Sequence, residues 1–130
     1  MKRISAHWSI VAILSISLAA MAHADPDIEN AEDQSFMELL DESGVLFSFN
    51  LEKHQGQRYC RDIIDGANDM DAIHDLMRNG GYSFDVANAI SSAATAAYCW
   101  CAVRESIGAA PWPDNQCNEF ENTYRRTGDY

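Results

Sequence analysis

The residues of this sequence with the greatest chemical potential are its four cysteines, Cys60, Cys99, Cys101 and Cys117. Two of them form a Cys-Trp-Cys motif, which could serve redox exchange or metal binding. A redox dithiol more often has the spacing Cys-x-x-Cys and lies at a helix N-terminus, which lowers its pKa. This motif instead falls near the end of a predicted helix. A zinc site needs roughly four sulfur or nitrogen ligands gathered in space. We therefore predict structural disulfides, with no metal and no cofactor.

Histidines and carboxylates offer the remaining routes to catalysis. Outside the N-terminal segment the chain has only His54 and His74, each a single histidine on a predicted helix, and the sequence contains no Gly-x-Ser-x-Gly nucleophile motif. The acidic segment 65–71 lacks the glycine and the terminal glutamate of a calcium-binding loop. Paired carboxylates can hydrolyse glycosides, but among 20 acids the sequence singles out no pair. We predict no catalytic residue.

Aromatic residues gather towards the C-terminus, at Trp100, Trp112, Phe120 and Tyr124. Large aromatic side chains often anchor binding surfaces, so these four residues form a candidate binding patch. The alternative is that they cover the end of a helical core. The sequence leaves both interpretations open.

The first 24 residues have the pattern of a secretory signal peptide. Lys2 and Arg3 give a basic start, residues 8–20 carry no charge, and small residues at Ala22 and Ala24 precede the cleavage point. The apolar stretch of thirteen residues is shorter than the roughly 20 that a spanning helix needs. We predict cleavage after Ala24, export to the cell envelope or the medium, and no transmembrane anchor afterwards.

Charge and length limit the function of the exported part. Removing the signal peptide from the 130-residue chain leaves 106 residues, a single-domain length, and lowers the net charge from −11 to −13. So acidic a chain repels phosphate backbones and anionic lipids, which argues against nucleic-acid binding. An even number of cysteines in a short exported chain predicts a disulfide framework. Three pairings are open at this point, and the oligomeric state is undefined.

Apolar residues begin to recur at helical spacing at Phe36. Asp33 is expected to cap a first helix that ends near Gly44. Residues 45–50 then alternate apolar and polar side chains, as a strand would, but no second strand is available to pair with them. We predict an extended connection that buries Phe47 and Phe49.

Two helices follow. The second begins near Leu51, which is assigned to its inward face, and is interrupted by Gly56. A glycine in a helix costs about 1 kcal/mol relative to alanine, so close approach of another helix would explain its presence. Asn68 or Asp69 caps a short third helix, with Met70 among its inward residues.

The fourth helix is predicted to be the longest. It is capped by Ser83, is rich in alanine and runs to about Ile107, where glycine and proline forbid its continuation. The predicted fold class is all-α, a small bundle of about four helices stapled by disulfides. Its parts are a flexible acidic leader (25–33), a helical disulfide-bridged domain (34–108) and a C-terminal extension (109–130).

Several of these features together resemble a known family. They are the Ser-Gly-Val turn at 43–45, Gly56 followed by Cys60, and Ala-Tyr-Cys at 97–99. In order and spacing they are similar to small exported mycobacterial proteins catalogued as domain of unknown function 732. The resemblance covers about residues 33–100 and implies a signal peptide followed by a short all-helical domain. The family has no assigned activity, so it supplies no catalytic residue.

The resemblance also implies one disulfide, Cys60–Cys99. Trp100 stands where the family usually has proline, so we expect the last helix to continue past the family's normal end. Cys101 and Cys117 would then form a second bridge. Cysteines two positions apart on a helix point in different directions, which suits two separate partners. We expect loss of the first bridge to destroy the fold or most of the export yield, and loss of the second only to free the tail.

These observations favour an exported, non-enzymatic protein of the cell envelope or the secretome. Its expected partner is an unidentified protein or envelope component. The first alternative is a carrier or sensor of a small ligand, held beneath the alanine-rich helix. The second is a small envelope hydrolase, for which the sequence offers only undirected carboxylates.

Overall fold

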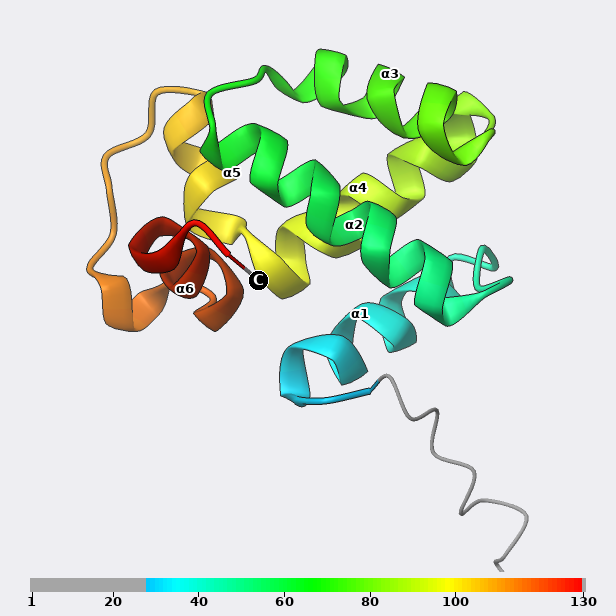
Figure 1. Cartoon of the computed structure of the whole chain (residues 1–130), viewed down its shortest axis with the longest axis horizontal. Coiled ribbons are helices and arrows are strands. Elements are labelled where there is room, and N and C mark those ends of the chain that lie inside the picture. Colours follow the sequence, from blue (N-terminus) through cyan, green and yellow to red (C-terminus); the bar gives the residue numbers. More distant parts are fainter. Residues whose placement is uncertain (1–27, 130) are drawn as a thin grey trace, which may run out of the picture.

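The computed structural model describes residues 28–129 of the chain. The predicted signal peptide, its cleavage site and residues 25–27 of the predicted leader lie outside the described residues. The described part is helical (Figure 1). It is stapled by two disulfides, so the predicted fold class is confirmed. The elements are α1 (Ala31–Glu42), α2 (Phe49–Ile64), α3 (Asp69–Gly80), α4 (Phe84–Tyr98), α5 (Trp100–Ser106), the 3₁₀ helix η2 (Asp114–Gln116) and α6 (Glu119–Thr127).

Helix α4 is central to the fold and packs against α1, α2 and α3 (Figure 1). Small residues such as Ala87 and Ala94 are buried along it. Gly56 of α2 lies at this crossing, where a Cβ would be 2.7 Å from ring carbon Cζ of Phe36 and 3.3 Å from the Cβ of Ala94. The predicted close approach of another helix at Gly56 is confirmed, and two helices approach there rather than one.

Helix α1 begins three residues before its predicted start. Asn30, not Asp33, is the N-cap, and its side-chain oxygen accepts a hydrogen bond from the N–H of Asp33 at 2.9 Å. Asp33 is instead buried, where it pairs with Lys53 Nζ at 2.8 Å and accepts a hydrogen bond from the Tyr98 hydroxyl at 2.7 Å. The end of the predicted leader is therefore helical, because a buried ion pair holds its last residue against α2 and α4.

The predicted connection at 45–50 is shorter than expected, because Ser48 is an N-cap and α2 begins at Phe49. Phe49 is buried as predicted, but Phe47 is 73% exposed. The Phe47 N–H donates to the buried carboxylate of Glu52 at 2.9 Å. In this helical register Phe49 and Glu52 face inwards, so Leu51 is exposed and its inward assignment is wrong.

Helix α3 begins at its predicted cap. The Asn68 side chain accepts a hydrogen bond from the N–H of Asp71 at 2.9 Å. Ile73 and Leu76 are buried, but Met70 is exposed, so its inward assignment is wrong. Met70 lies in the first turn of α3, three residues before Ile73 and at the end of the inward stripe.

The predicted long fourth helix is two helices. It breaks at Cys99, whose backbone leaves the helical conformation, and α5 departs from α4 at 113°. The same residue is bonded to Cys60 of α2. Within residues 28–129, no single helix has the length and apolar character to cross a membrane; α4 and α5 meet that criterion only when taken together across the bend.

Candidate functional site

The four cysteines form the two predicted bridges. Cys60–Cys99 joins α2 to the end of α4, and Cys101–Cys117 joins α5 to the segment before α6. The pairing implied by the family resemblance is thus confirmed. The Sγ atoms of Cys101 and Cys117 lie close to a carboxylate oxygen of Glu121, within 4.8 Å, but both sulfurs are bonded to each other. This group is structural, as its hydrogen bonds show.

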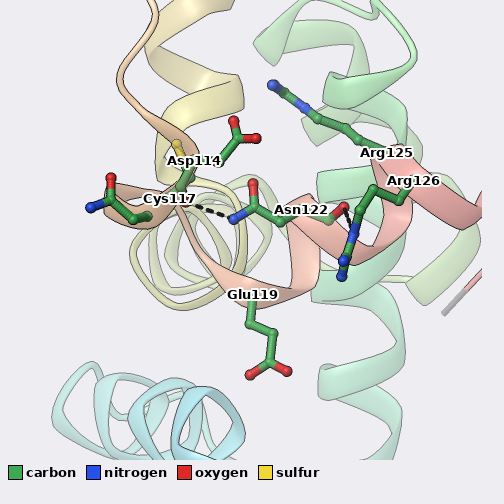
Figure 2. Close-up of a pocket in the computed structure, with 7 residues that line it drawn as sticks. Asp114, Cys117, Glu119, Asn122, Arg125 and Arg126 are labelled. Carbon is green, nitrogen blue, oxygen red and sulfur yellow. Dashed lines mark hydrogen bonds between the residues drawn. The ribbon is translucent and has the colours of Figure 1, made fainter.

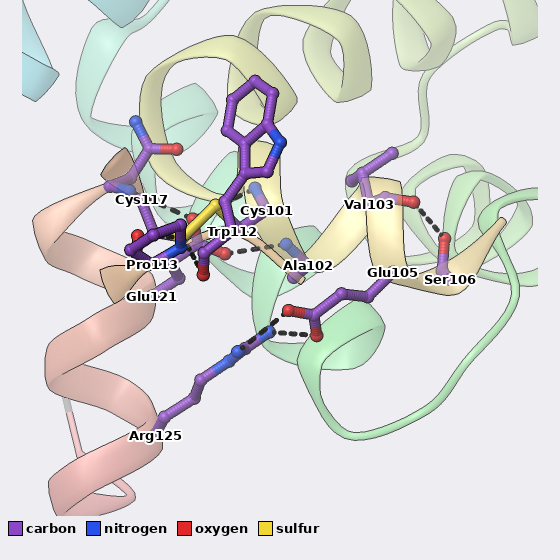
Figure 3. Close-up of polar contacts among 11 residues, drawn as sticks. Cys101, Ala102, Val103, Glu105, Ser106, Trp112, Pro113, Cys117, Glu121 and Arg125 are labelled. Carbon is purple, nitrogen blue, oxygen red and sulfur yellow. Dashed lines mark hydrogen bonds and ion pairs between the residues drawn. A yellow bond between two sulfur atoms is a disulfide. The ribbon is translucent and has the colours of Figure 1, made fainter. Parts of the chain in front are cut away.

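Glu121 of α6 is completely buried and organises the start of α5 (Figure 3). Its Oε1 accepts hydrogen bonds from the N–H groups of Cys101 at 3.1 Å and Asn118 at 3.0 Å, and its Oε2 accepts one from Ala102 at 2.8 Å. The Asn118 side chain accepts a further bond from the N–H of Trp100 at 2.8 Å. These groups satisfy the first N–H donors of α5, and a negative charge is favourable at that end of a helix.

Helix α6 is itself capped from α1. The two carboxylate oxygens of Glu32 accept hydrogen bonds from the N–H groups of Glu119 and Phe120, both at 2.9 Å. Burial raises the pKa of Glu32, although these two N–H groups act in the opposite direction. Glu32 of α1 therefore caps α6, and Glu121 of α6 in turn caps α5. We call these successive contacts the relay of caps.

Two members of the predicted aromatic patch belong to the packing of α6. Phe120 is fully buried, with its ring centroid 5.3 Å from that of Tyr98, so it adds nothing to an exposed patch. The Tyr124 ring stacks on Phe120, and its hydroxyl donates to Asp65 at 2.8 Å, which raises the pKa of Tyr124. The C-terminal segment is thus packed on the domain by more than its disulfide. These contacts hold the C-terminal segment in addition to the Cys101–Cys117 bridge.

The other two members, Trp100 and Trp112, form an exposed corner together with Arg104. We call these three residues the aromatic corner. Trp100 is 43% exposed and Trp112 is 39% exposed, and their ring centroids are 6.3 Å apart. The Arg104 guanidinium carbon lies 3.8 Å from the centroid of the Trp112 ring, in cation–π contact. Trp112 lies in the loop between α5 and η2, and the Cys101–Cys117 bridge ties the chain after this loop to α5. The bridge therefore helps to bring the two indoles together.

A groove of about 350 Å³ lies beside the corner, between α4 and α5, and we call it the α4–α5 groove. Tyr59, Ser91 and Thr95 line its inner part, and Tyr59 and Ser91 are buried. The Tyr59 hydroxyl donates to the carboxylate of Asp69 at the rim. Burial first, and then this hydrogen bond, raise the pKa of Tyr59. Trp100 contributes to both the groove and the aromatic corner.

Sequence reasoning missed the polar wall of this groove, formed by Asn88 and Ser92. Both are exposed, and neither side chain makes a hydrogen bond to another described residue. They lie four residues apart on one helical face, with Thr95 three residues further. That spacing was the one signal in the sequence that could have placed them together.

A second hollow, of about 400 Å³, lies over α6. Figure 2 shows Asn122 between Asp114 and Arg126, and it is hydrogen-bonded to both. Its side-chain NH₂ group donates to the Asp114 backbone carbonyl at 2.7 Å, and its backbone carbonyl accepts from the Arg126 side chain. Arg125 pairs with Glu105 of α5 at 2.9 Å (Figure 3). Asn122, Arg125 and Arg126 are thus engaged in contacts that pack α6 on the rest of the chain.

The two histidines lie apart from each other and from the groove. His54 is exposed on α2 and lines a shallow hollow with Asn50 and Lys53, and His74 is exposed on α3. Neither histidine lines the α4–α5 groove, and the carboxylate that does is Asp69.

A family model described as "Protein of unknown function (DUF732)" matches residues 32–100. The chain belongs to this family. Among curated proteins and among solved structures, no match to the chain is found. The DUF732 segment contains the Cys60–Cys99 bridge and most of the groove, and it ends on Trp100.

The groups that set the direction of α5 follow the DUF732 segment. Asn118 and Glu121, which bind the first N–H groups of α5, lie in the last fifth of the chain, as does Cys117. Trp112 also follows the matched residues. In this chain the family segment therefore supplies most of the groove, and the residues after it complete the groove and hold the aromatic corner in place.

Proposed function

We propose that this protein is an exported, non-enzymatic binding protein of the cell envelope or the secretome. Export is supported by the signal-peptide pattern at residues 1–24 and by two disulfides, which are typical of oxidising compartments. All four cysteines are bonded, so none of them is available as a reactive thiol.

The observation that carries this proposal is the aromatic corner. Trp and Arg are the residue types that most often dominate binding energy at interfaces. Here Trp100, Trp112 and Arg104 are gathered on one surface by a helix break, a disulfide and the Glu121 cap. A surface held in this way loses little conformational freedom on binding, which favours affinity. Its partner is proposed to be a protein or another envelope component.

A small-ligand carrier or sensor is the second candidate, and the α4–α5 groove favours it. Its volume of about 350 Å³ lies at the lower end of the range for small-molecule sites, roughly 300–1,000 Å³. The groove gives less support to a hydrolase, because its carboxylate, Asp69, is already engaged by the Tyr59 hydroxyl.

Site-specific photo-crosslinking in cells that export the full chain tests this proposal. A benzophenone amino acid replaces Ile107, which is 76% exposed and lines the groove, or Phe47, which is 73% exposed and lies in the α1–α2 connection. We expect a specific adduct from position 107, its loss when Trp112→Ala is added, and none from position 47. Equal labelling from both positions would contradict a binding role for the corner.

Export itself is tested by mass spectrometry of the secreted and envelope fractions. The expected mass corresponds to a chain that starts at Asp25 with four oxidised cysteines. A chain that keeps residues 1–24 and carries free thiols would contradict the exported half of the proposal.

A further inference from the structure

We propose that the α4–α5 groove binds a neutral, polyhydroxylated ring, that is, a sugar of mono- or disaccharide size. This inference rests on the proposed function as a binding protein and names the ligand class of the groove beside the aromatic corner.

The two walls of the groove differ in chemistry. The wall from α5 is apolar and consists of Trp100, Val103 and Ile107. The side formed by α4 is polar and carries Asn88 and Ser92. A sugar ring has the same asymmetry, with a face of C–H groups that packs on an aromatic ring and an edge of hydroxyls that require hydrogen-bond partners.

The free polar groups of the groove suit hydroxyls better than ions. The Asn88 amide offers two donors and an acceptor, and the Ser92 hydroxyl offers both, and neither is engaged by another described residue. A hydroxyl can donate and accept, so it can satisfy both side chains. An ammonium group can donate to the Asn88 and Ser92 oxygens, but it has no acceptor for the two Asn88 N–H donors and leaves them unsatisfied.

Charge excludes an anionic ligand. Among the residues that line the groove, the charged one is Asp69, a carboxylate, and no lysine or arginine lines it. The Tyr59 hydroxyl donates to one oxygen of this carboxylate, so the other oxygen can accept a hydrogen bond from a ligand hydroxyl. The whole chain carries a net charge of −11, which repels anions further.

Trp100 is held in position without help from a ligand. Its backbone N–H donates to the Asn118 side chain, and its ring contacts Trp112. The next residue of α5, Cys101, is bridged to Cys117. A stacking platform that is already ordered pays less entropy on binding. The inner part of the groove is also ordered, because the Thr95 hydroxyl donates to the Ser91 carbonyl at 2.8 Å.

The test is an NMR titration of the oxidised chain without residues 1–24, using glucose, galactose, mannose, cellobiose, maltose and lactose, each to about 50 mM, because shallow sites bind weakly. Tryptophan fluorescence is followed in parallel, since both tryptophans after residue 24 lie in the aromatic corner. We expect at least one sugar to give saturable shifts at Ser92, Asn88 and the Trp100 indole N–H. Benzylamine and inorganic phosphate serve as cationic and anionic probes, and we expect no saturable shift from either.

Variants separate specific binding from general effects. Asn88→Ala and Ser92→Ala should each weaken sugar binding about three- to tenfold, as expected for one lost hydrogen bond, and Trp100→Ala should weaken it at least tenfold. Asn115→Ala, at the hollow over α6, and Phe47→Ala, an exposed aromatic residue in the α1–α2 connection, should leave it unchanged.

The outcomes distinguish this inference from the proposed function. If no sugar gives saturable shifts at the groove, or if benzylamine binds there and sugars do not, this inference is overturned, while crosslinking from position 107 would still support a binding protein. If sugars bind but position 107 yields no adduct, the groove inference holds and the macromolecular partner is wrong. Unchanged sugar affinity in Asn88→Ala and Ser92→Ala would also overturn the inference.

Discussion

Replacing Glu121 with glutamine should destabilise the domain far more than the same change at its neighbour Glu119. The two oxygens of Glu121 accept three backbone N–H groups in a fully buried site. Glutamine has one oxygen and one NH₂ group, so the NH₂ group must face at least one N–H donor. One hydrogen bond to a charged group, worth about 1.5–3 kcal/mol, is then lost, and the buried N–H left unpaired adds about 1–3 kcal/mol.

After allowance for local relaxation we expect a loss of about 2–4 kcal/mol in the free energy of unfolding, or a fall in Tm of roughly 10–30 °C for a domain of this size. Glu119→Gln is the matched control. Glu119 is exposed on the same turn of α6, so its replacement removes the same charge from the same acidic surface without removing a cap. We expect that variant to change stability by less than about 0.5 kcal/mol.

The assay is urea unfolding of the oxidised chain without residues 1–24, followed by tryptophan fluorescence and by circular dichroism. Fluorescence reports the aromatic corner, because Trp100 and Trp112 are the tryptophans of this part of the chain. Circular dichroism reports all helices. If Glu121→Gln unfolds at the same urea concentration as Glu119→Gln, the buried cap does not hold α5, and the account of how the corner is positioned is refuted.

Three further predictions concern the core and the bridges. Gly56→Ala should lower stability by about 1–3 kcal/mol in urea unfolding, because the added Cβ meets the Phe36 ring; an equally stable variant would contradict this packing. Cys60→Ser opens a loop with a sequence separation of 39 and should lower the free energy of unfolding by about 4 kcal/mol and remove most of the exported yield. Cys117→Ser opens a loop with a separation of 16; it should lower the free energy of unfolding by about 3 kcal/mol and leave the chain helical by circular dichroism. Because the folded pKa of Tyr59 is raised above 10, its contribution to stability is present below that pH and falls as the pH rises further. Tyr59→Phe should therefore show a shallower loss of stability as the pH rises above about 10.

Local signals in the sequence were sufficient where the structure is determined locally. Ser83 was predicted as a helix cap, and Asn68 was one of two candidates for another. Both side chains accept the backbone N–H three residues later. Gly56 indicated a close helix contact because a glycine in a helix needs a compensating reason. These features depend on a few neighbouring residues, so a single sequence contains the information.

The break at Cys99 had no such local signal. Residues 84–106 contain neither glycine nor proline, so they read as one helix. The groups that end α4 and start α5 are Asn118 and Glu121, which lie 18 to 20 residues from the N–H groups they bind. Local periodicity carries no information about acceptors so far along the chain.

The candidate site was predicted in part. Trp100 and Trp112 were correctly grouped as aromatic residues near one another, but Phe120 was misassigned, because its burial depends on Tyr98 of α4. The groove was missed because it draws residues from α2, α3, α4 and α5. Asn88 and Ser92 have no chemical signature of their own, and only tertiary packing brings them into one groove with Trp100.

The relay of caps has a consequence for what the DUF732 segment can reveal. Trp100 is its last matched residue, yet the side chain follows α5, whose first N–H groups are bound by residues of α6. Helix α6 in turn begins on Glu32, at the other end of the matched segment. The two ends of the segment therefore both contact the residues that follow it. Glu32, near its start, caps α6, and Trp100, at its end, donates its backbone N–H to Asn118. Any binding role of the corner in this protein depends on that closed arrangement, so it belongs to the whole folded chain and cannot be assigned from residues 32–100 alone.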